Sequence, residues 1–93
     1  MLVTFEYWVS FGKGDYGESY IEMEITEEEC ERLRKAEEVC EDFYKCEMVA
    51  DIYERAYELA DREATANLQA DGILAKDKRA SEVYPIEVCY PGI

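Results

Sequence analysis

Residues 2–11 read Leu2-Val3-Thr4-Phe5-Glu6-Tyr7-Trp8-Val9-Ser10-Phe11, a nearly strict alternation of two kinds of side chain. The odd-numbered positions are all β-branched or aromatic: Val3, Phe5, Tyr7, Val9 and Phe11. Successive side chains of a strand point to opposite faces, so the pattern predicts a half-buried β-strand with this set in the core. Trp8 then lies on the other face.

A second alternating stretch follows a turn. Residues 12–17 are rich in glycine, and from Glu18 to Ile25 apolar and polar positions alternate: Ile21, Met23 and Ile25 against Tyr20, Glu22 and Glu24. Two alternating runs joined by turn formers are typical of a β-hairpin. We predict this hairpin over residues 1–25.

The turn itself, Gly12-Lys13-Gly14-Asp15-Tyr16-Gly17, spells a GxGxxG motif. A dinucleotide fold needs this loop between a strand and a helix, whereas here a strand follows. The strand-loop-strand setting resembles the glycine-rich loop of protein kinases, but the other kinase motifs are absent and 93 residues cannot hold that fold. We interpret the glycines as turn residues and predict no cofactor.

Thr26 and the three glutamates after it predict the start of a helix, because Thr26 and Glu29 match the capping-box pattern. Apolar stripes at helical spacing follow, first Cys30, Leu33, Ala36, Cys40 and Phe43, and then a stripe from Val49 to Ala64. We predict a helical region over 27–69. One unbroken helix would be about 63 Å long in a domain with a radius of gyration near 12 Å, so we expect a break near 39–46.

Residues 83–90 alternate again and predict a third strand, and Pro85 and Pro91 indicate that it either lies at a sheet edge or begins and ends abruptly. The predicted fold class is therefore α+β in a single domain, 1–93. It is a two-layer ββααβ arrangement, with a three-stranded, mainly antiparallel sheet and two helices packed on one face. The other face stays open and carries Leu2, Thr4, Trp8, Tyr20, Glu22 and Glu24.

The chain has 10 Lys and Arg against 23 Asp and Glu, no histidine, and a formal charge of -13. Without histidine, Ser/His and Cys/His nucleophile schemes and His-ligated zinc are excluded. The negative charge argues against direct binding to nucleic acid or to anionic membranes, which need a basic surface. No calcium-loop motif is present, so we predict no metal site. Because the nucleophile schemes above are excluded, we also predict a non-enzymatic protein.

Four cysteines, at 30, 40, 46 and 89, form no CxxC pair, and we expect reduced thiols that act as small hydrophobic groups. The first residues lack the features of a signal peptide, and no apolar run approaches the ~20 residues of a membrane span. We therefore expect a cytoplasmic protein. Cys40 and Cys46 lie at the expected helix break. A thiol-dependent enzyme or a redox sensor therefore stays open as a further class of function, besides the binding and structural roles considered below.

Part of the negative charge has local partners, because five acids precede a base by four residues: Glu28 and Arg32, Glu31 and Lys35, Glu41 and Lys45, Asp51 and Arg55, and Glu58 and Arg62. Residues 15–31, in contrast, contain eight acids and no base. This cluster is either a solvated face that keeps the protein soluble or a docking surface for a basic partner.

We predict the docking surface, with Trp8 and Tyr20 as an exposed aromatic pair among the acids. Its residues are Trp8, Asp15, Glu18, Tyr20, Glu22, Glu24, Glu27, Glu28 and Glu31. The expected partner is a basic protein, for instance a nucleic-acid-binding enzyme whose groove the carboxylates occupy in place of phosphates. In size and charge the chain resembles the small acidic inhibitors of phages and mobile elements, anti-CRISPR proteins among them.

Two alternatives remain for the face that carries Trp8. It is covered by residues 74–81, or it is the contact of a homodimer, in which case the protein is a self-associating structural or accessory subunit.

Overall fold

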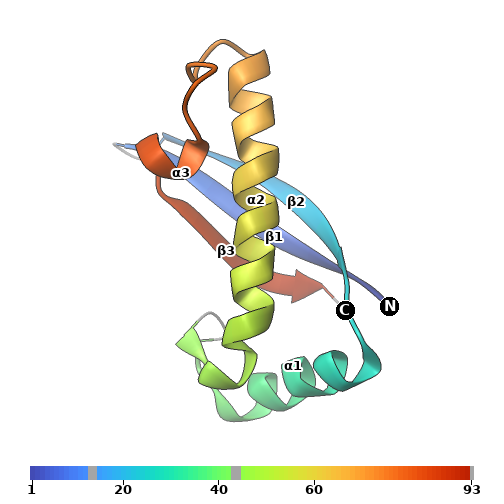
Figure 1. Ribbon diagram of the computed structural model, residues 1–93. Helices are drawn as coiled ribbons and strands as arrows, with labels where there is room; N and C mark the ends of the chain where they lie inside the picture. Colours follow the sequence, from blue (N-terminus) through green and yellow to red (C-terminus); the bar gives the residue numbers. More distant parts are fainter. Residues whose placement is uncertain (13–14, 43–44, 93) are drawn as a thin grey trace.

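The computed structural model describes residues 1–12, 15–42 and 45–92. The elements in chain order are β1 (Leu2–Gly12), β2 (Asp15–Glu24), α1 (Glu27–Val39), the short 3₁₀ helix η2 (Glu47–Val49), α2 (Ala50–Ala70), α3 (Ala80–Val83) and β3 (Ile86–Gly92). In Figure 1, α2 crosses one face of the sheet and α1 runs crosswise beneath its first turns. The fold is α+β with an antiparallel sheet, as predicted.

The sheet has the order β2-β1-β3, so the first alternating stretch of the chain forms its central strand. Val3, Phe5, Tyr7 and Val9 of β1 are at most 5% exposed, which confirms the predicted core face. Phe11 was predicted to join them and is instead 37% exposed. It lies at the hairpin end of the strand, where its ring packs edge-on against Tyr84 at 5.1 Å.

The core lies between this face and α2. The helix is buried along one side through Ile52, Tyr53, Ala56, Ala60, Ala64 and Leu68. Three of these are alanines, which let the helix backbone approach the sheet closely. The ring of Tyr53 packs edge-on against Phe5 at 5.5 Å, and α1 adds Cys30, Leu33 and Ala36 to the same cluster. Because α2 packs on this face of the sheet, the free face is the opposite one.

The capping box at the start of α1 is formed as predicted. The backbone N–H of Glu29 donates to Thr26 Oγ1 at 3.1 Å, and the Thr26 N–H donates to the Glu29 carboxylate at 2.9 Å. The helix ends at Val39, and η2 begins at Glu47. Phe43, assigned above to the first apolar stripe, lies outside the described residues.

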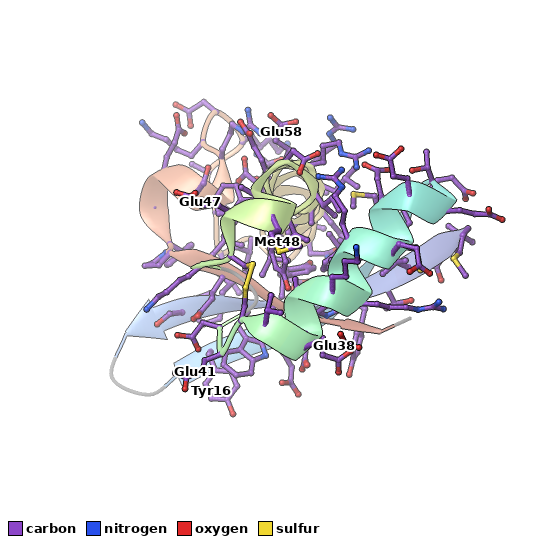
Figure 2. The ribbon with its side chains drawn as sticks, turned by 90° about the horizontal axis from the view of Figure 1, so that it is seen from below. Tyr16, Glu38, Glu41, Glu47, Met48 and Glu58 are labelled. Carbon is purple, nitrogen blue, oxygen red and sulfur yellow. A yellow bond between two sulfur atoms is a disulfide. The ribbon has the colours of Figure 1, made fainter. Side chains whose placement is uncertain are left out.

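Cys40 and Cys46 form a disulfide across this break, which corrects the expectation that all four thiols are reduced. Their Cα atoms are 6.2 Å apart, within the range that a disulfide requires. The bond is drawn in yellow in Figure 2. Cys30 and Cys89 are free and buried.

The third strand begins at Ile86, not at 83, because the residues before it form α3. Polar side chains of α2 hold this short helix: Thr65 Oγ1 accepts from the Ala80 N–H at 2.8 Å, and Asp61 accepts from the Ser81 N–H at 3.0 Å. Asp61 also pairs with Arg79 and is only 3% exposed. The segment before β3 is therefore attached to the helical layer.

Two arginines make ion pairs between α1 and α2 that differ from the predicted pairs within one helix. Arg32 binds Asp51 through hydrogen bonds of 2.9 and 3.0 Å, and Arg55 pairs with Glu29. Spacing along one helix could not reveal these contacts, because they depend on how α1 and α2 cross. None of the described helices is long and apolar enough to span a membrane.

Candidate functional site

The face of the sheet opposite α2, here called the open face, is formed by the even-numbered residues of β1 and β2 together with Glu87 of β3. The strand register fixes their arrangement. Trp8 lies between Glu18 on β2 and Glu87 on β3, so carboxylates flank the indole on both sides. Further along β1, Glu6 lies opposite Tyr20, Thr4 opposite Glu22, and Leu2 opposite Glu24.

These side chains are accessible to solvent. Tyr16 and Tyr20 are 61% and 60% exposed, Glu18, Glu22, Glu24 and Glu87 are exposed, and Trp8 is half-buried among its neighbours. Residues 74–81, considered above as a cover, pack against α2 on the other layer: Leu74 and Ala80 are in the core, and Gln69 Nε2 donates to the carbonyls of Ala75, Lys76 and Lys78. That segment is not the cover of this face.

The aromatic group on the open face differs in part from the predicted one. The Trp8 ring lies 6.0 Å from the ring of Tyr16 in a tilted arrangement, and Trp8 Nε1 donates to the Glu6 carboxylate at 3.3 Å. Tyr20, the predicted partner, lies opposite Glu6. The prediction omitted Tyr16 because it was assigned to the turn, although Tyr16, like Glu18, is an even-numbered residue and so belongs to the same face. The same alternation in the third strand would have identified Glu87.

The acids of the sheet and the acids of the helical layer differ in their basic partners. The three strands carry six acids, Glu6, Asp15, Glu18, Glu22, Glu24 and Glu87, and no lysine or arginine. On the helical layer, by contrast, Arg32, Arg55 and Arg79 bind acids. There the hydrogen bond from the Thr26 backbone, together with Arg55 and Arg32, holds the pKa of Glu29 below its ordinary value, against the opposing effect of burial. On the sheet, Glu24 pairs with the amino group of Met1.

Apart from Asp15, the predicted site residues fall into two groups in the structure. Trp8, Glu18, Tyr20, Glu22 and Glu24 share the open face. Glu27, Glu28 and Glu31 are exposed on the first turns of α1, where Glu31 pairs with Arg34 at 3.2 Å. Asp15 begins β2 opposite Gly12, and its side chain lies outside the described part of the chain.

A groove of about 380 Å³ lies at the hairpin end of the molecule, between the helix-facing side of the sheet and the C-terminal half of α2. Tyr7, Gly17 and Ser19 line it from the sheet, and Asn67 and Leu68 line it from the helix. Burial, opposed by a hydrogen bond with Ser19, raises the pKa of Tyr7, so its phenol is protonated at neutral pH. The groove therefore offers hydrogen bonds and apolar surface.

The free thiol of Cys89 lies in an environment that lowers its reactivity. Burial and then the charges of Glu87 and Glu6 raise the pKa of Cys89 to about 11, so its thiol is protonated and weakly nucleophilic at neutral pH. Within the described ranges, no group of three His, Cys, Asp or Glu side chains is placed to hold a metal ion. What the open face does combine is exposed aromatic area and unbalanced negative charge.

Comparison of the chain with protein families, with curated proteins and with solved structures finds no match.

Proposed function

We propose that this protein is a non-enzymatic acidic binding module whose open face docks into a basic groove of a partner protein and excludes nucleic acid from it. In this role it is an inhibitor that mimics nucleic acid, similar in character to anti-CRISPR proteins. The observation that carries the proposal is the position of Trp8 between Glu18 and Glu87, on a sheet whose strands have no basic residue.

The geometry of β2 suits a partner that binds phosphates. Alternate residues of a strand are about 6.6 Å apart, so the carboxylates from Glu18 to Glu24 extend along about 20 Å of one edge of the face. Nucleic acid presents a similarly dense line of negative charge. Lysines and arginines of a groove would be steered toward this row, and arginines could also stack on Trp8, Tyr16 and Tyr20.

A role in solubility alone explains the surface less well. Solubility is served by charge of any location, and a magnitude of about 2 to 8 suffices for a small domain, against -13 here. Exposed aromatic rings oppose solubility, yet Tyr16 and Tyr20 stand among the carboxylates. Aromatic anchors with charged residues around them are the usual composition of a binding hot spot.

The alternative, a homodimer through the face that carries Trp8, is opposed by the same charges. In a symmetric dimer each surface meets its own copy, so Glu18, Glu22 and Glu87 of one chain would face the same carboxylates of the other. A basic partner meets no such repulsion. Light scattering at high protein concentration and neutral pH distinguishes the two, because the dimer requires a doubled mass that Trp8→Ala abolishes.

The proposed site of action is the cytoplasm, where enzymes that bind nucleic acids work. A structural disulfide such as Cys40–Cys46 is unusual in that compartment, so the redox state of this pair in the native cell bears on the location.

The proposal is tested by competition. The protein is immobilised, a lysate of its native host is passed over it, and retained proteins are challenged with duplex DNA and with RNA. We expect a basic nucleic-acid-binding protein that either nucleic acid displaces. A partner that stays bound at saturating nucleic acid would contradict the mimicry.

A further inference from the structure

Strand β2 has a free edge. It is an outer strand of the three-stranded sheet, and within residues 1–12, 15–42 and 45–92 its ten residues, Asp15–Glu24, pair with β1 alone. Figure 1 shows no labelled helix or strand along its outer side. Such an edge presents a row of backbone N–H and C=O groups that a further strand can pair with.

The register shows which residues supply those groups. Met1 and Ile25 exchange two backbone hydrogen bonds, Met1 N to Ile25 O at 3.1 Å and Ile25 N to Met1 O at 2.9 Å. Hydrogen-bonded and non-hydrogen-bonded pairs alternate along an antiparallel ladder. The odd-numbered residues of β2 therefore bond to β1, and the groups that point outward belong to Tyr16, Glu18, Tyr20, Glu22 and Glu24. These residues also place their side chains on the open face.

The opposite edge of the sheet is protected and β2 is not. Strand β3 is shorter than β2, with Pro91 within it and Pro85 before it. Prolines, bulges and short length are the usual ways in which proteins block an edge strand. Strand β2 has no proline and no lysine, so only the charge of its glutamates restrains pairing.

The negative charge of β2 determines which kind of strand can pair with its free edge. A second copy of β2 would bring glutamates against glutamates, whereas a strand with lysines or arginines would neutralise them. In antiparallel pairing, the residues opposite Glu18, Tyr20 and Glu22 point their side chains to the open face. The basic residues of an added strand are therefore expected at every second position.

The intervening side chains would point to the helical side. Near Gly17 and Ser19 they would enter the groove beside Leu68 and the half-exposed Ile73. That surface accepts apolar groups. An added strand thus meets two different environments, one for each of its faces.

From this arrangement we propose that the free edge of β2 binds an extended segment of a basic protein as a fourth, antiparallel strand, in which basic and apolar residues alternate. The proposal rests on the function proposed above and specifies how the partner is held. Backbone hydrogen bonds fix the segment, the open-face glutamates select its basic residues, and the groove takes an apolar side chain.

The test uses three short synthetic peptides with the intact protein. The first alternates lysine and valine, the second carries N-methyl groups on its lysine amides, and the third carries them on its valine amides. Lysine amides would point toward β2 and valine amides away, so only the second peptide loses the pairing. Binding is measured by calorimetry, and hydrogen exchange reports the amides of Glu18, Tyr20 and Glu22.

We expect the first and third peptides to bind alike, the second to bind about tenfold more weakly, and the three amides to exchange more slowly in the complex. Equal, salt-dependent binding of all three peptides without slower exchange would overturn strand addition and leave the acidic docking surface in place. No binding of any peptide at low salt would overturn both proposals.

Discussion

Trp8 of β1 and Glu18 of β2 lie directly opposite each other in the sheet, on the face that α2 does not cover. The hydrogen-bonding alternation makes theirs a non-hydrogen-bonded pair, the kind in which opposite side chains come closest, with Cα atoms about 4.5 Å apart. A half-buried indole is thus held beside a carboxylate that no neighbouring strand residue neutralises. This pair is the centre of the surface to which we assign binding.

Replacing Trp8 by alanine should weaken binding to the alternating lysine-valine peptide by about tenfold or more, because central aromatic residues contribute most to interface energies. Calorimetry measures the change. Tyr57→Ala is the matched control, since Tyr57 is an aromatic residue that is 39% exposed on α2. Equal losses in the two variants would remove Trp8 from the site.

Asp61→Asn should lower the free energy of unfolding by about 1 to 3 kcal/mol, because a buried charge-assisted contact to Arg79 and the Ser81 N–H is lost. Burial alone would raise the pKa of Asp61, but the Ser81 N–H and Arg79 outweigh it and hold that pKa below its ordinary value of 3.8. The contribution is therefore complete at neutral pH and is lost as pH falls through the lowered pKa.

Urea unfolding of both proteins across this pH range measures the effect. The difference between wild type and Asp61→Asn should shrink only in acid below the ordinary aspartate pKa, while Asp77→Asn, at an exposed aspartate, should change little at any pH. A difference that persists unchanged in strong acid would show that the charge of Asp61 is not its cause.

Much of the fold follows from patterns that are local in the sequence. The alternation of residues 2–11 predicts the central strand and its buried face, and Thr26 with Glu29 predicts the start of α1, because strand periodicity and capping need only near neighbours. Contacts between distant segments leave no such pattern. The pairing of Arg32 with Asp51 depends on how two helices cross, and no spacing rule contains that information.

The candidate site was predictable to the same extent. Parity placed Trp8, Tyr20 and Glu22 on the open face, while Tyr16 was missed because the length of the turn was uncertain from sequence. The Cys40–Cys46 disulfide was missed because it depends on the path of the chain between two helices.

Tyr53→Phe should raise the free energy of unfolding by about 1 kcal/mol. Tyr53 is 8% exposed, and its hydroxyl has no hydrogen-bond partner among the described residues. Burial, and then the nearby Cys89, raise the pKa of Tyr53, so the group stays neutral and its removal costs no charge interaction. Since a buried hydroxyl without a partner is unfavourable, phenylalanine should fit better. Thermal and urea unfolding measure the change, and a loss of stability would contradict this account of the site.

The thiols should differ in reactivity. In the folded protein, iodoacetamide should label none of them, because Cys40 and Cys46 are bonded and Cys30 and Cys89 are buried. After mild reduction, the half-buried Cys40 should react, while Cys46, Cys30 and Cys89, each at most 8% exposed, should react only in urea. Opening this short loop should lower the free energy of unfolding by about 2 kcal/mol. Mass spectrometry reads the sites, and rapid labelling of Cys89 without denaturant would contradict its raised pKa of about 11.

The most direct test of the acidic docking surface compares two triple variants with the same net charge. One changes Glu18, Glu22 and Glu87 on the open face to glutamine. The other changes Glu47, Glu54 and Glu58, exposed acids of the helical layer, of which Glu58 lies on the opposite side of the molecule from Tyr16 in Figure 2.

Affinity for the alternating lysine-valine peptide is measured for wild type and both variants over a range of salt concentrations. The open-face variant should bind about tenfold more weakly at low salt and depend less on salt, while the helical-layer variant should stay within about twofold of wild type. Equal losses in both variants would show that net charge alone attracts the peptide, and would contradict the assignment of binding to the open face.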